Sequence, residues 1–575
     1  MNEIMNKKIE NDVKDISSNK YHESISLKKI LKIIPLGGAG MVTKNMWIYE
    51  YGEDILIIDC GMGFPDEDML GVDMVIPDIS YLRERASRIK GMFLTHGHED
   101  HIGAVPYVLK ELSIPLYGSK LTLGLVRAKL QEYEMDKGVI FNVIESDDKI
   151  KIGNFDLEFV HLAHSVPDHL GVIIKIPEGK ILHAPDYKFD WTPVDGKPTE
   201  VHKLAKLRGE LLLLLSDCVR IEKDGYTLTE RAIEETFEKE MQKAKGRVLI
   251  TTFSSNISRL QQAINAAQKY HRKIAFVGRS IYRNMEVAQQ LNYLSFPRDT
   301  VIEPKEIKKY NPDELVILIS GSQGQSNSAL ARVANDDHPM VQIQEGDVVI
   351  FASDPIPGNL DSVYKVIDQL SERGAEVRYS EITDDVHVSG HAAKEELKFM
   401  LGLTLPKFLV PIGGEIRHGK MFAGIAKDMG IQETLIMKEG DTLRIENGNC
   451  KLGERIKTSE VMIDGADLEN IQDIVIRDRQ VLSKDGIFLV VVTIDKNAKT
   501  LISEPEVVSR GFVYMKEADK ILDDTRSIVI QTIKGKIHED SDPKFLRRQL
   551  ITALERYIYK QTEMRPMILP VIITV

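Results

Sequence analysis

The stretch Thr95-His96-Gly97-His98-Glu99-Asp100-His101 decides how the rest of this chain is understood. It follows a short apolar run, residues 91–94, that is typical of a strand, so its polar side chains stand on a loop at a strand end. Imidazole nitrogens and carboxylate oxygens are the donors that zinc and similar divalent ions take. A solvated turn that happens to be rich in histidine is the alternative. The density and spacing of the donors favour a metal site.

The loop offers donors for two ions. His96 and His98 can converge on one ion, while Asp100 and His101 turn toward a second. A catalytic site of this kind leaves one coordination position for water. The spacing therefore predicts a catalytic metal centre with room for two ions.

Two later residues also stand just past predicted strands. His164 follows the apolar run 155–162, and Asp186 follows the run 180–183. Taken singly, each is more often structural. In this order behind the histidine loop, they predict that His164 completes the nitrogens of the first ion and that Asp186 bridges both ions.

Asp59 closes an apolar strand, residues 55–58, and is followed by Cys60-Gly61. One interpretation is that it caps a turn. The other is that its carboxylate accepts a hydrogen bond from a metal-binding histidine and orients that ring. Both interpretations stay open from the sequence.

The composition places the chain among globular proteins with several domains. Its 575 residues suggest about three or four domains, and 43% hydrophobic and 28% charged residues are ordinary values. A net charge of −12 argues against coating nucleic acid through the whole surface, although a local basic channel stays compatible with it. Cys60, Cys218 and Cys450 are widely spaced, so neither a disulfide framework nor a thiolate zinc site is expected, and a cytoplasmic location is predicted.

The polar N-terminal segment, residues 1–27, mixes acidic residues with lysines. This pattern predicts a disordered tail and neither a signal peptide nor a transit peptide. The longest apolar runs, such as residues 487–494, have the length of a strand. No membrane association is therefore expected.

The ordered motifs around the histidine loop resemble the metallo-β-lactamase fold. Neighbouring motifs narrow the resemblance to the ribonuclease J family of β-CASP nucleases: Phe64-Pro65-Asp66-Glu67, Gly71-Val72-Asp73, Ile76-Pro77-Asp78, Leu94 to Ala104 and Thr192-Pro193-Val194-Asp195-Gly196-Lys197-Pro198. The resemblance extends from about Lys32 to Val575. It is carried by several motifs in the same order and not by one short pattern.

The expected fold class is α/β: a metallo-β-lactamase αββα sandwich with an inserted β-CASP α/β domain and a small α+β C-terminal domain. Alternating strands and helices after Asp217 predict a parallel sheet in the insertion. The expected boundaries are residues 1–27 for the tail, 28–218 and 380–450 for the split metallo-β-lactamase domain, 219–379 for the β-CASP domain, and 451–575 for a linker and the C-terminal domain.

Two elements are predicted within the C-terminal domain. Residues 487–495 are typical of a buried strand. Asp542-Pro543 predicts the start of a helix. One face of that helix is marked by apolar residues at helical spacing: Leu546, Leu550, Leu554 and Tyr557.

The resemblance implies a metal-dependent ribonuclease, a hydrolase that cleaves phosphodiester bonds of single-stranded RNA as an endonuclease and as a 5′-to-3′ exonuclease. RNA processing and decay, including rRNA processing and mRNA decay, are the implied settings. The imidazoles favour Zn²⁺ at two sites, while Mn²⁺ or Mg²⁺ stays open where carboxylates dominate. A homodimer or homotetramer is implied as well.

The resemblance also assigns roles at the site. His391 is the general acid that protonates the leaving oxygen, Asp217 is its acidic partner, and Asp186 is catalytic because it bridges the ions. Substrate contacts are expected from residues of the His-x-Ser-Gly-His motif and of two Gly/Ser loops: His387, Ser389, Gly390, Ser322 and Arg279. Lys188, Arg259 and Arg283 are further candidates to line an RNA path, with a solvated charge as the default for each.

Several positions depart from the family pattern. Gly413 stands where the family usually has a histidine ligand of the second ion, so that ion is expected to bind weakly, and His418 is a weak candidate to replace it. Asp354 stands near a phosphate pocket in place of a serine and would repel a 5′-monophosphate. The other departures are Pro185, Ser258, Cys218-Val219-Arg220 and Met41-Val42-Thr43.

These departures keep a second hypothesis open: a catalytically weakened RNA-binding subunit that partners an active homologue. Metal content and RNA cleavage distinguish the two. A third hypothesis, a small-molecule hydrolase on the same fold, is disfavoured by the long insertion and the C-terminal domain.

Overall fold

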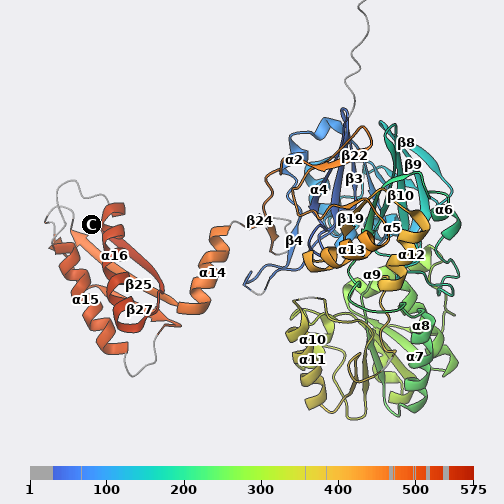
Figure 1. The fold of residues 1–575 in the computed structure, drawn as a ribbon. Coiled ribbons are helices and arrows are strands. Elements are labelled where there is room, and N and C mark those ends of the chain that lie inside the picture. Colours follow the sequence, from blue (N-terminus) through green and yellow to red (C-terminus); the bar gives the residue numbers. More distant parts are fainter. Residues whose placement is uncertain are drawn as a thin grey trace, which may run out of the picture. The chain divides into compact units, whose positions relative to one another are not determined.

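The computed structural model describes residues 30–575 apart from residues 67, 357, 384, 465–469, 472, 496–497, 499, 513–517 and 535–542. The predicted tail over residues 1–27 and the predicted helix start at Asp542 lie outside these residues. The chain divides into two compact units, one of residues 1–63 and 76–460 and the other of residues 64–75 and 461–575 (Figure 1). Within the described ranges, no helix is long and apolar enough to cross a membrane.

Two facing sheets form the centre of the first unit. One sheet has the strand order β22 (Asn449–Leu452), β21 (Leu443–Glu446), β1 (Leu31–Gly37), β2 (Met46–Tyr51), β3 (Asp54–Ile58), β5 (Ile89–Leu94), β6 (Leu116–Gly118) and β7 (Phe141–Val143). The other has the order β20 (Glu433–Thr434), β19 (Phe408–Ile412), β12 (Leu211–Asp217), β11 (Gly179–Ala184), β10 (Leu170–Ile176), β9 (Phe155–His161) and β8 (Lys149–Ile152). Pairing is parallel from β3 to β7 and from β11 to β20. The site lies at the ends of β3, β5, β11 and β12 in these regions and of the antiparallel β9.

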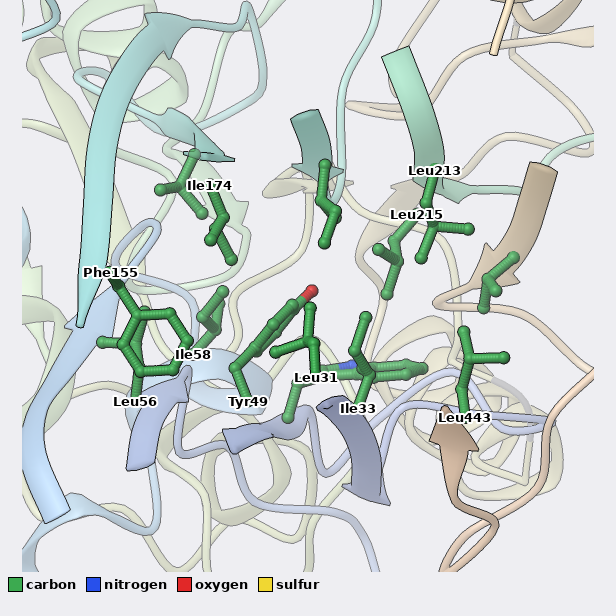
Figure 2. Packing of buried hydrophobic residues seen from close by; sticks show 14 of the residues in the cluster. Leu31, Ile33, Tyr49, Leu56, Ile58, Phe155, Ile174, Leu213, Leu215 and Leu443 are labelled. Atoms are coloured by element: carbon green, nitrogen blue, oxygen red, sulfur yellow. The ribbon is translucent and has the colours of Figure 1, made fainter. Parts of the chain in front are cut away.

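Apolar side chains fill the space between the two sheets. Figure 2 shows residues of both sheets pointing toward one another: Leu31, Ile33, Tyr49, Leu56, Ile58 and Leu443 from the first sheet, and Phe155, Ile174, Leu213 and Leu215 from the second. Their spacing follows the period of two along each strand. Each fully buried Leu, Ile or Phe side chain contributes roughly 1.5–3 kcal/mol. This layer therefore fixes the strands whose ends carry the site.

Helices cover the outer faces of the sheets. α12 (Lys394–Thr404) and α13 (Ile416–Asp428) pack on the second sheet in a cluster that includes Leu182, Leu214, Leu397 and Phe422. α5 (Lys120–Glu132) packs against β6 of the first sheet and against α4 (Val105–Glu111). The order helix, sheet, sheet, helix confirms the predicted αββα sandwich.

The chain leaves the second sheet after β12 and returns at β19, which pairs with β12 in parallel. The intervening segment forms a parallel sheet in the order β15 (Val301–Ile302), β14 (Lys273–Val277), β16 (Leu315–Ile319), β13 (Val248–Thr251), β17 (Val348–Phe351) and β18 (Glu376–Arg378). The helices of this segment are α7 (Arg231–Lys243), α8 (Ile257–Lys269), α9 (Arg279–Gln290), α10 (Ala329–Ala334) and α11 (Leu360–Glu372). The predicted α/β insertion is confirmed. Parallel strands end at one edge, so the Gly/Ser loops after β13, β14, β16 and β17 gather there.

The second unit is built around β25 (Ile487–Asp495). It pairs with β26 (Thr500–Leu501) and β27 (Glu506–Arg510) antiparallel, and with β28 (Met567–Thr574) parallel. α14 (Asp473–Asp485) precedes β25, and α15 (Ala518–Lys534) and α16 (Pro543–Thr562) follow β27. The predicted strand over residues 487–495 is confirmed, but only four of its nine positions are fully buried and the other five are half-buried. Burial alternates along β25, because α15 and α16 pack on the face that carries Val490 and Val492.

Candidate metal centre

Asp59 holds the histidine-rich loop. β3 and β5 are parallel neighbours, so Asp59 at the end of β3 lies beside Thr95 at the end of β5. Its carboxylate accepts hydrogen bonds from the Thr95 backbone nitrogen at 2.8 Å and from Thr95 Oγ1 at 2.9 Å. The same carboxylate lies 2.7 Å from His101 Nδ1. With Nδ1 engaged, His101 presents its Nε2 to Asp186 at 3.1 Å.

Three groups of possible metal donors share Asp186: two contain the predicted ligands, and the third is Asp186 with Asp217 and His391. The ligand atoms of the first group, three imidazoles and one carboxylate, all lie within 4.8 Å of one another: His96, His98, His164 and Asp186. The second group meets the same limit: Asp100, His101 and Asp186. The structure thus brings together the six residues that the sequence proposed as ligands, from three separate segments that follow β5, β9 and β11.

The spacing of the donor atoms fits a divalent ion. In the first group, His98 Nδ1 lies 3.2 Å from His96 Nε2 and 3.1 Å from His164 Nε2. Ligand atoms about 2.0–2.1 Å from a tetrahedral zinc ion are roughly 3.3 Å apart. Asp186 Oδ2 lies 3.6 Å from His96 Nε2, so the carboxylate closes the same group. The donor set and its spacing therefore suit bound divalent metal.

Burial gives the first group the protonation state that metal binding requires. It lowers the pKa of His96 and His98 well below the ordinary value and that of His164 to about 4. These imidazoles are therefore neutral near pH 7, the form that binds metal. Burial acts to raise the pKa of Asp186, but the neighbouring His101 outweighs it and holds that pKa well below its usual range. The shared carboxylate is thus ionised.

A histidine–aspartate pair borders the donor groups. His391 Nδ1 lies 2.8 Å from Oδ2 of Asp217, the buried last residue of β12. Burial acts to lower the pKa of His391, but Asp217 and Asp186 raise it to about 9. The neighbouring Gly390 carbonyl lies 2.8 Å from His164 Nδ1, so the same loop also orients a metal donor. A protonated imidazole is thereby fixed beside the proposed ions.

Comparison with known proteins decides the family. Models of the metallo-beta-lactamase superfamily, of the ribonuclease J beta-CASP domain and of the ribonuclease J C-terminal domain match residues 39–279, 245–370 and 474–575. Ribonuclease J2 of Bacillus subtilis is 39% identical over 95% of this chain and 99% of its own length. The chain belongs to the ribonuclease J family. The predicted resemblance is confirmed.

Other relatives agree with this assignment. Ribonuclease J 1 of Streptococcus pyogenes is 38% identical over 96% of this chain and 99% of its own length. Ribonuclease J of Thermus thermophilus is 39% identical over 94% of this chain and 95% of its own. A solved structure of a protein of unknown function from Enterococcus faecalis shares 16% identity and a TM-score of 0.54, covering 72% of this chain and 100% of that one. That likeness supports the fold alone.

Gly413 is the residue that the resemblance predicts in place of a histidine ligand of the second ion. A Cβ built here would lie 3.6 Å from both Asp186 Oδ1 and Asp217 Oδ1, so a side chain would point between these two carboxylates. The backbone φ of 64° favours glycine. His418 does not replace the missing ligand, because its Nδ1 accepts a hydrogen bond from the Glu415 backbone nitrogen at the start of α13 and it belongs to neither donor group.

Asp354 lies on the loop after β17, next to the His387 motif. Its Oδ2 is 3.7 Å from His387 Nε2, and its side chain is 47% exposed. Gln323 holds the loop by donating to the Asp354 carbonyl at 2.9 Å and accepting from the Ile356 backbone nitrogen at 2.7 Å. The carboxylate therefore adds negative charge beside a residue proposed to contact substrate.

The other residues proposed to contact substrate differ in accessibility. Ser389 Oγ accepts a backbone hydrogen bond within its own loop. A Cβ at Gly390 would lie 2.5 Å from His164 Cε1, so only glycine fits against that ring. Ser322 is buried in the loop after β16, and Arg279 is exposed at the start of α9. Arg279 is thus the most exposed of the five residues proposed to contact substrate.

The expectation that Lys188 and Arg259 line an RNA path is wrong. Both side chains are buried, and both contact Glu230: Lys188 Nζ lies 3.0 Å from Oε1, and an Arg259 guanidinium nitrogen lies 2.7 Å from Oε2. The same guanidinium donates to the carbonyls of Ala352 at 2.5 Å and Val388 at 3.2 Å. This network joins α8 to the loops that follow β11 and β17 and to the loop that carries His391.

Glu230→Gln is expected to lower the free energy of unfolding by about 3–5 kcal/mol, because the buried Arg259 loses its counter-charge and Lys188 keeps only Asp190, at 3.6 Å. Burial acts to raise the pKa of Glu230, but Lys188 and Arg259 lower it to about 2. This stabilisation is present above about pH 4.3, the unfolded value, and is lost as the pH falls toward 2. Urea unfolding measures the change. Glu238→Gln, in an exposed pair with Lys269, serves as the control and should cost no more than about 1 kcal/mol.

Sequence reasoning passed over His169. Its ring is fully buried, with its centroid 4.7 Å from that of His96 and 5.7 Å from that of His164. In the described part of the chain, neither ring nitrogen has a hydrogen-bond partner. Its position in the sequence could have indicated it, because His169 directly follows the His164 to Asp168 motif and precedes β10. A further imidazole thus packs against two of the three imidazoles of the first donor group.

Proposed function

We propose that this chain is a metal-dependent ribonuclease that hydrolyses phosphodiester bonds in single-stranded RNA, both internally and from a 5′ end. The observation that carries the proposal is the convergence of two donor groups on one ionised carboxylate, Asp186, beside the protonated His391. Membership in the ribonuclease J family supports RNA as the substrate. RNA processing and decay are the proposed setting.

The residues present fit two divalent ions. His96, His98 and His164 would hold the first ion, Asp100 and His101 the second, and Asp186 both. When bound, such ions lower the pKa of a coordinated water and neutralise charge on the phosphate. Buried imidazoles favour Zn²⁺ for the first ion, whereas the carboxylates of the second group also suit Mn²⁺ or Mg²⁺. The absence of a side chain at Gly413 weakens the second site.

His391 is the proposed general acid. Asp217 takes the hydrogen bond from Nδ1, which leaves Nε2 to give a proton to the leaving oxygen of the RNA. Its pKa of about 9 keeps the ring protonated at neutral pH. Arg279, Ser322, His387, Ser389 and Gly390 are the residues proposed to contact the RNA near this group.

Asp217→Asn is expected to move the alkaline limit of activity to lower pH. Without the Asp217 charge, the pKa of His391 falls from about 9 toward the unperturbed value of about 6.5. As the pH rises, the variant should therefore lose activity at a lower pH than the wild type. A pH profile of kcat/KM with a short RNA measures this. An unshifted alkaline limit would contradict the assigned pair.

The test of the proposed function combines elemental analysis with RNA cleavage. Purified chain should contain at least one tightly held ion and should degrade 5′-monophosphorylated and 5′-triphosphorylated RNA, and His98→Ala should lose both properties. Metal-free chain that leaves RNA intact after long incubation would instead support a catalytically weak RNA-binding subunit. The assembled donor groups do not favour that alternative.

Assembly and location are further parts of the proposal. The ribonuclease J resemblance supports a homodimer or homotetramer, which sedimentation equilibrium of the full chain tests. Cys60, Cys218 and Cys450 are free and buried. Free thiols suit the reducing cytoplasm, which is the location proposed.

A further inference from the structure

The outer face of α16 carries aromatic and basic side chains on one stripe. At about 100° per residue, Phe545, Arg548, Thr552, Arg556 and Tyr559 fall within one side of the helix over about 21 Å. All five are exposed, and the two aromatic side chains are 42% and 45% exposed. The stripe therefore presents two rings to solvent with two guanidinium groups between them.

The core of the second unit does not explain this stripe. The inner side of α16 consists of Leu546, Leu550, Leu554 and Ile558, which are buried against the sheet and α15. These residues repeat every four positions and provide the apolar face that anchors the helix. Phe545 and Tyr559 add nothing to that face. A role outside packing accounts better for their position.

The charge on α16 contrasts with that of the chain. The helix holds five basic residues and one acidic residue, whereas the chain has a net charge of −12. Among the described residues, no acid pairs with the side chains of Arg548 or Arg556. Lys560 is exposed at the end of the stripe, and the Arg565 guanidinium lies 4.7 Å from the centre of the Tyr559 ring. The stripe is thus a local cationic surface on an acidic protein.

We propose that this outer face of α16 binds single-stranded RNA. Unpaired arginines attract the phosphate backbone, and exposed aromatic rings stack on unpaired bases without regard to sequence. An acidic protein segment would pair with the arginines but would leave the aromatic rings without a stacking partner, so RNA fits the stripe better. The inference rests on the proposed function, because it gives the same substrate a second holding surface on the second unit of the chain.

The test measures binding in the full-length chain with His98→Ala added to prevent cleavage. Anisotropy of an unstructured labelled RNA of about 30 nucleotides, longer than one single-strand binding site, is followed at several salt concentrations. Arg548→Gln with Arg556→Gln should weaken binding roughly tenfold. The dependence of log K on log salt should fall by about 1.4, the contribution of two phosphate contacts to a single strand.

Matched variants separate the contributions. Arg477→Gln with Lys484→Gln removes two exposed charges from α14 and should leave affinity and salt dependence unchanged. Phe545→Ala with Tyr559→Ala should weaken binding about tenfold without altering the salt dependence, because stacking releases no counterions. Equal losses in the α14 and α16 charge variants would overturn the proposal, since a general charge effect would then suffice.

Two further outcomes would also overturn it. One is unchanged binding after Arg548→Gln with Arg556→Gln. The other is a change of assembly mass in the same variant, which would make this face a contact between copies of the chain. Cleavage of a short RNA by the chain with His98 intact tests the proposed function separately. A chain that binds long RNA through α16 but cleaves no RNA contradicts the proposed function and supports this inference.

Discussion

Asp186→Ala is expected to lower RNA hydrolysis by at least about 10³-fold, the upper end of the loss for a single electrostatic donor. The change removes the one carboxylate that both donor groups share, so it affects both proposed ions at once. Metal content should fall with activity, because the three imidazoles of the first group lose the acidic donor that closes it. Single-turnover cleavage of labelled RNA and elemental analysis after gel filtration measure the two effects.

Asp195→Ala is the matched control for this experiment. Asp195 is an exposed carboxylate on the loop that follows Asp186, and it belongs to neither donor group. Its removal should leave cleavage and metal content within about twofold of the wild type, as expected for a surface change of less than about 0.5 kcal/mol. Cleavage by Asp186→Ala at the wild-type rate, in protein that unfolds normally, would remove Asp186 from the mechanism.

Gly413→His is expected to strengthen binding of the second ion by at least about tenfold. Losing a hydrogen-bond partner of a ligand already costs about 10–100-fold in metal affinity, so an added ligand should gain at least as much. A side chain at this position points between Asp186 and Asp217. Titration of metal-free protein with Zn²⁺ and with Mn²⁺, followed by calorimetry, measures the affinity. Hydrolysis should rise at metal concentrations that leave the second wild-type site unfilled.

Gly413→Ala separates ligation from backbone strain. The φ of 64° costs any L residue about 1–2 kcal/mol, and alanine has that cost without the imidazole. Alanine should therefore lower the unfolding temperature as histidine does but leave the affinity for the second ion unchanged. Equal metal affinity in the histidine and alanine variants would show that Gly413 is not the reason for a weak second site.

Local sequence patterns predicted most of the residues of the candidate site. His164 and Asp186 each follow a buried strand, and β-strand ends that share an edge bring such residues together whatever their separation in the chain. Asp59 was left with two interpretations. In the structure, its carboxylate accepts a hydrogen bond from Thr95 and also contacts His101. Both partners lie far along the chain, so the pattern of residues 55–61 could not decide between the two interpretations.

Contacts between distant segments explain what the sequence could not predict. Lys188 and Arg259 were candidates to line an RNA path, with a solvated charge as the alternative, and the structure buries both instead. Their actual partner, Glu230, lies 42 and 29 residues away and has no motif of its own. The alternating burial of β25 likewise depends on where α15 and α16 pack, and the exposed stripe of α16 can be recognised only once the inner face of the helix is known.

X-ray diffraction from crystals grown with Zn²⁺, with anomalous data at the zinc edge, tests the central claim most directly. We expect an anomalous peak among the nitrogens of His96, His98 and His164, with Asp186 in contact, and a weaker or partly filled peak near Asp100 and His101. A fully occupied zinc peak elsewhere on the chain, with none among these three imidazoles, would contradict it.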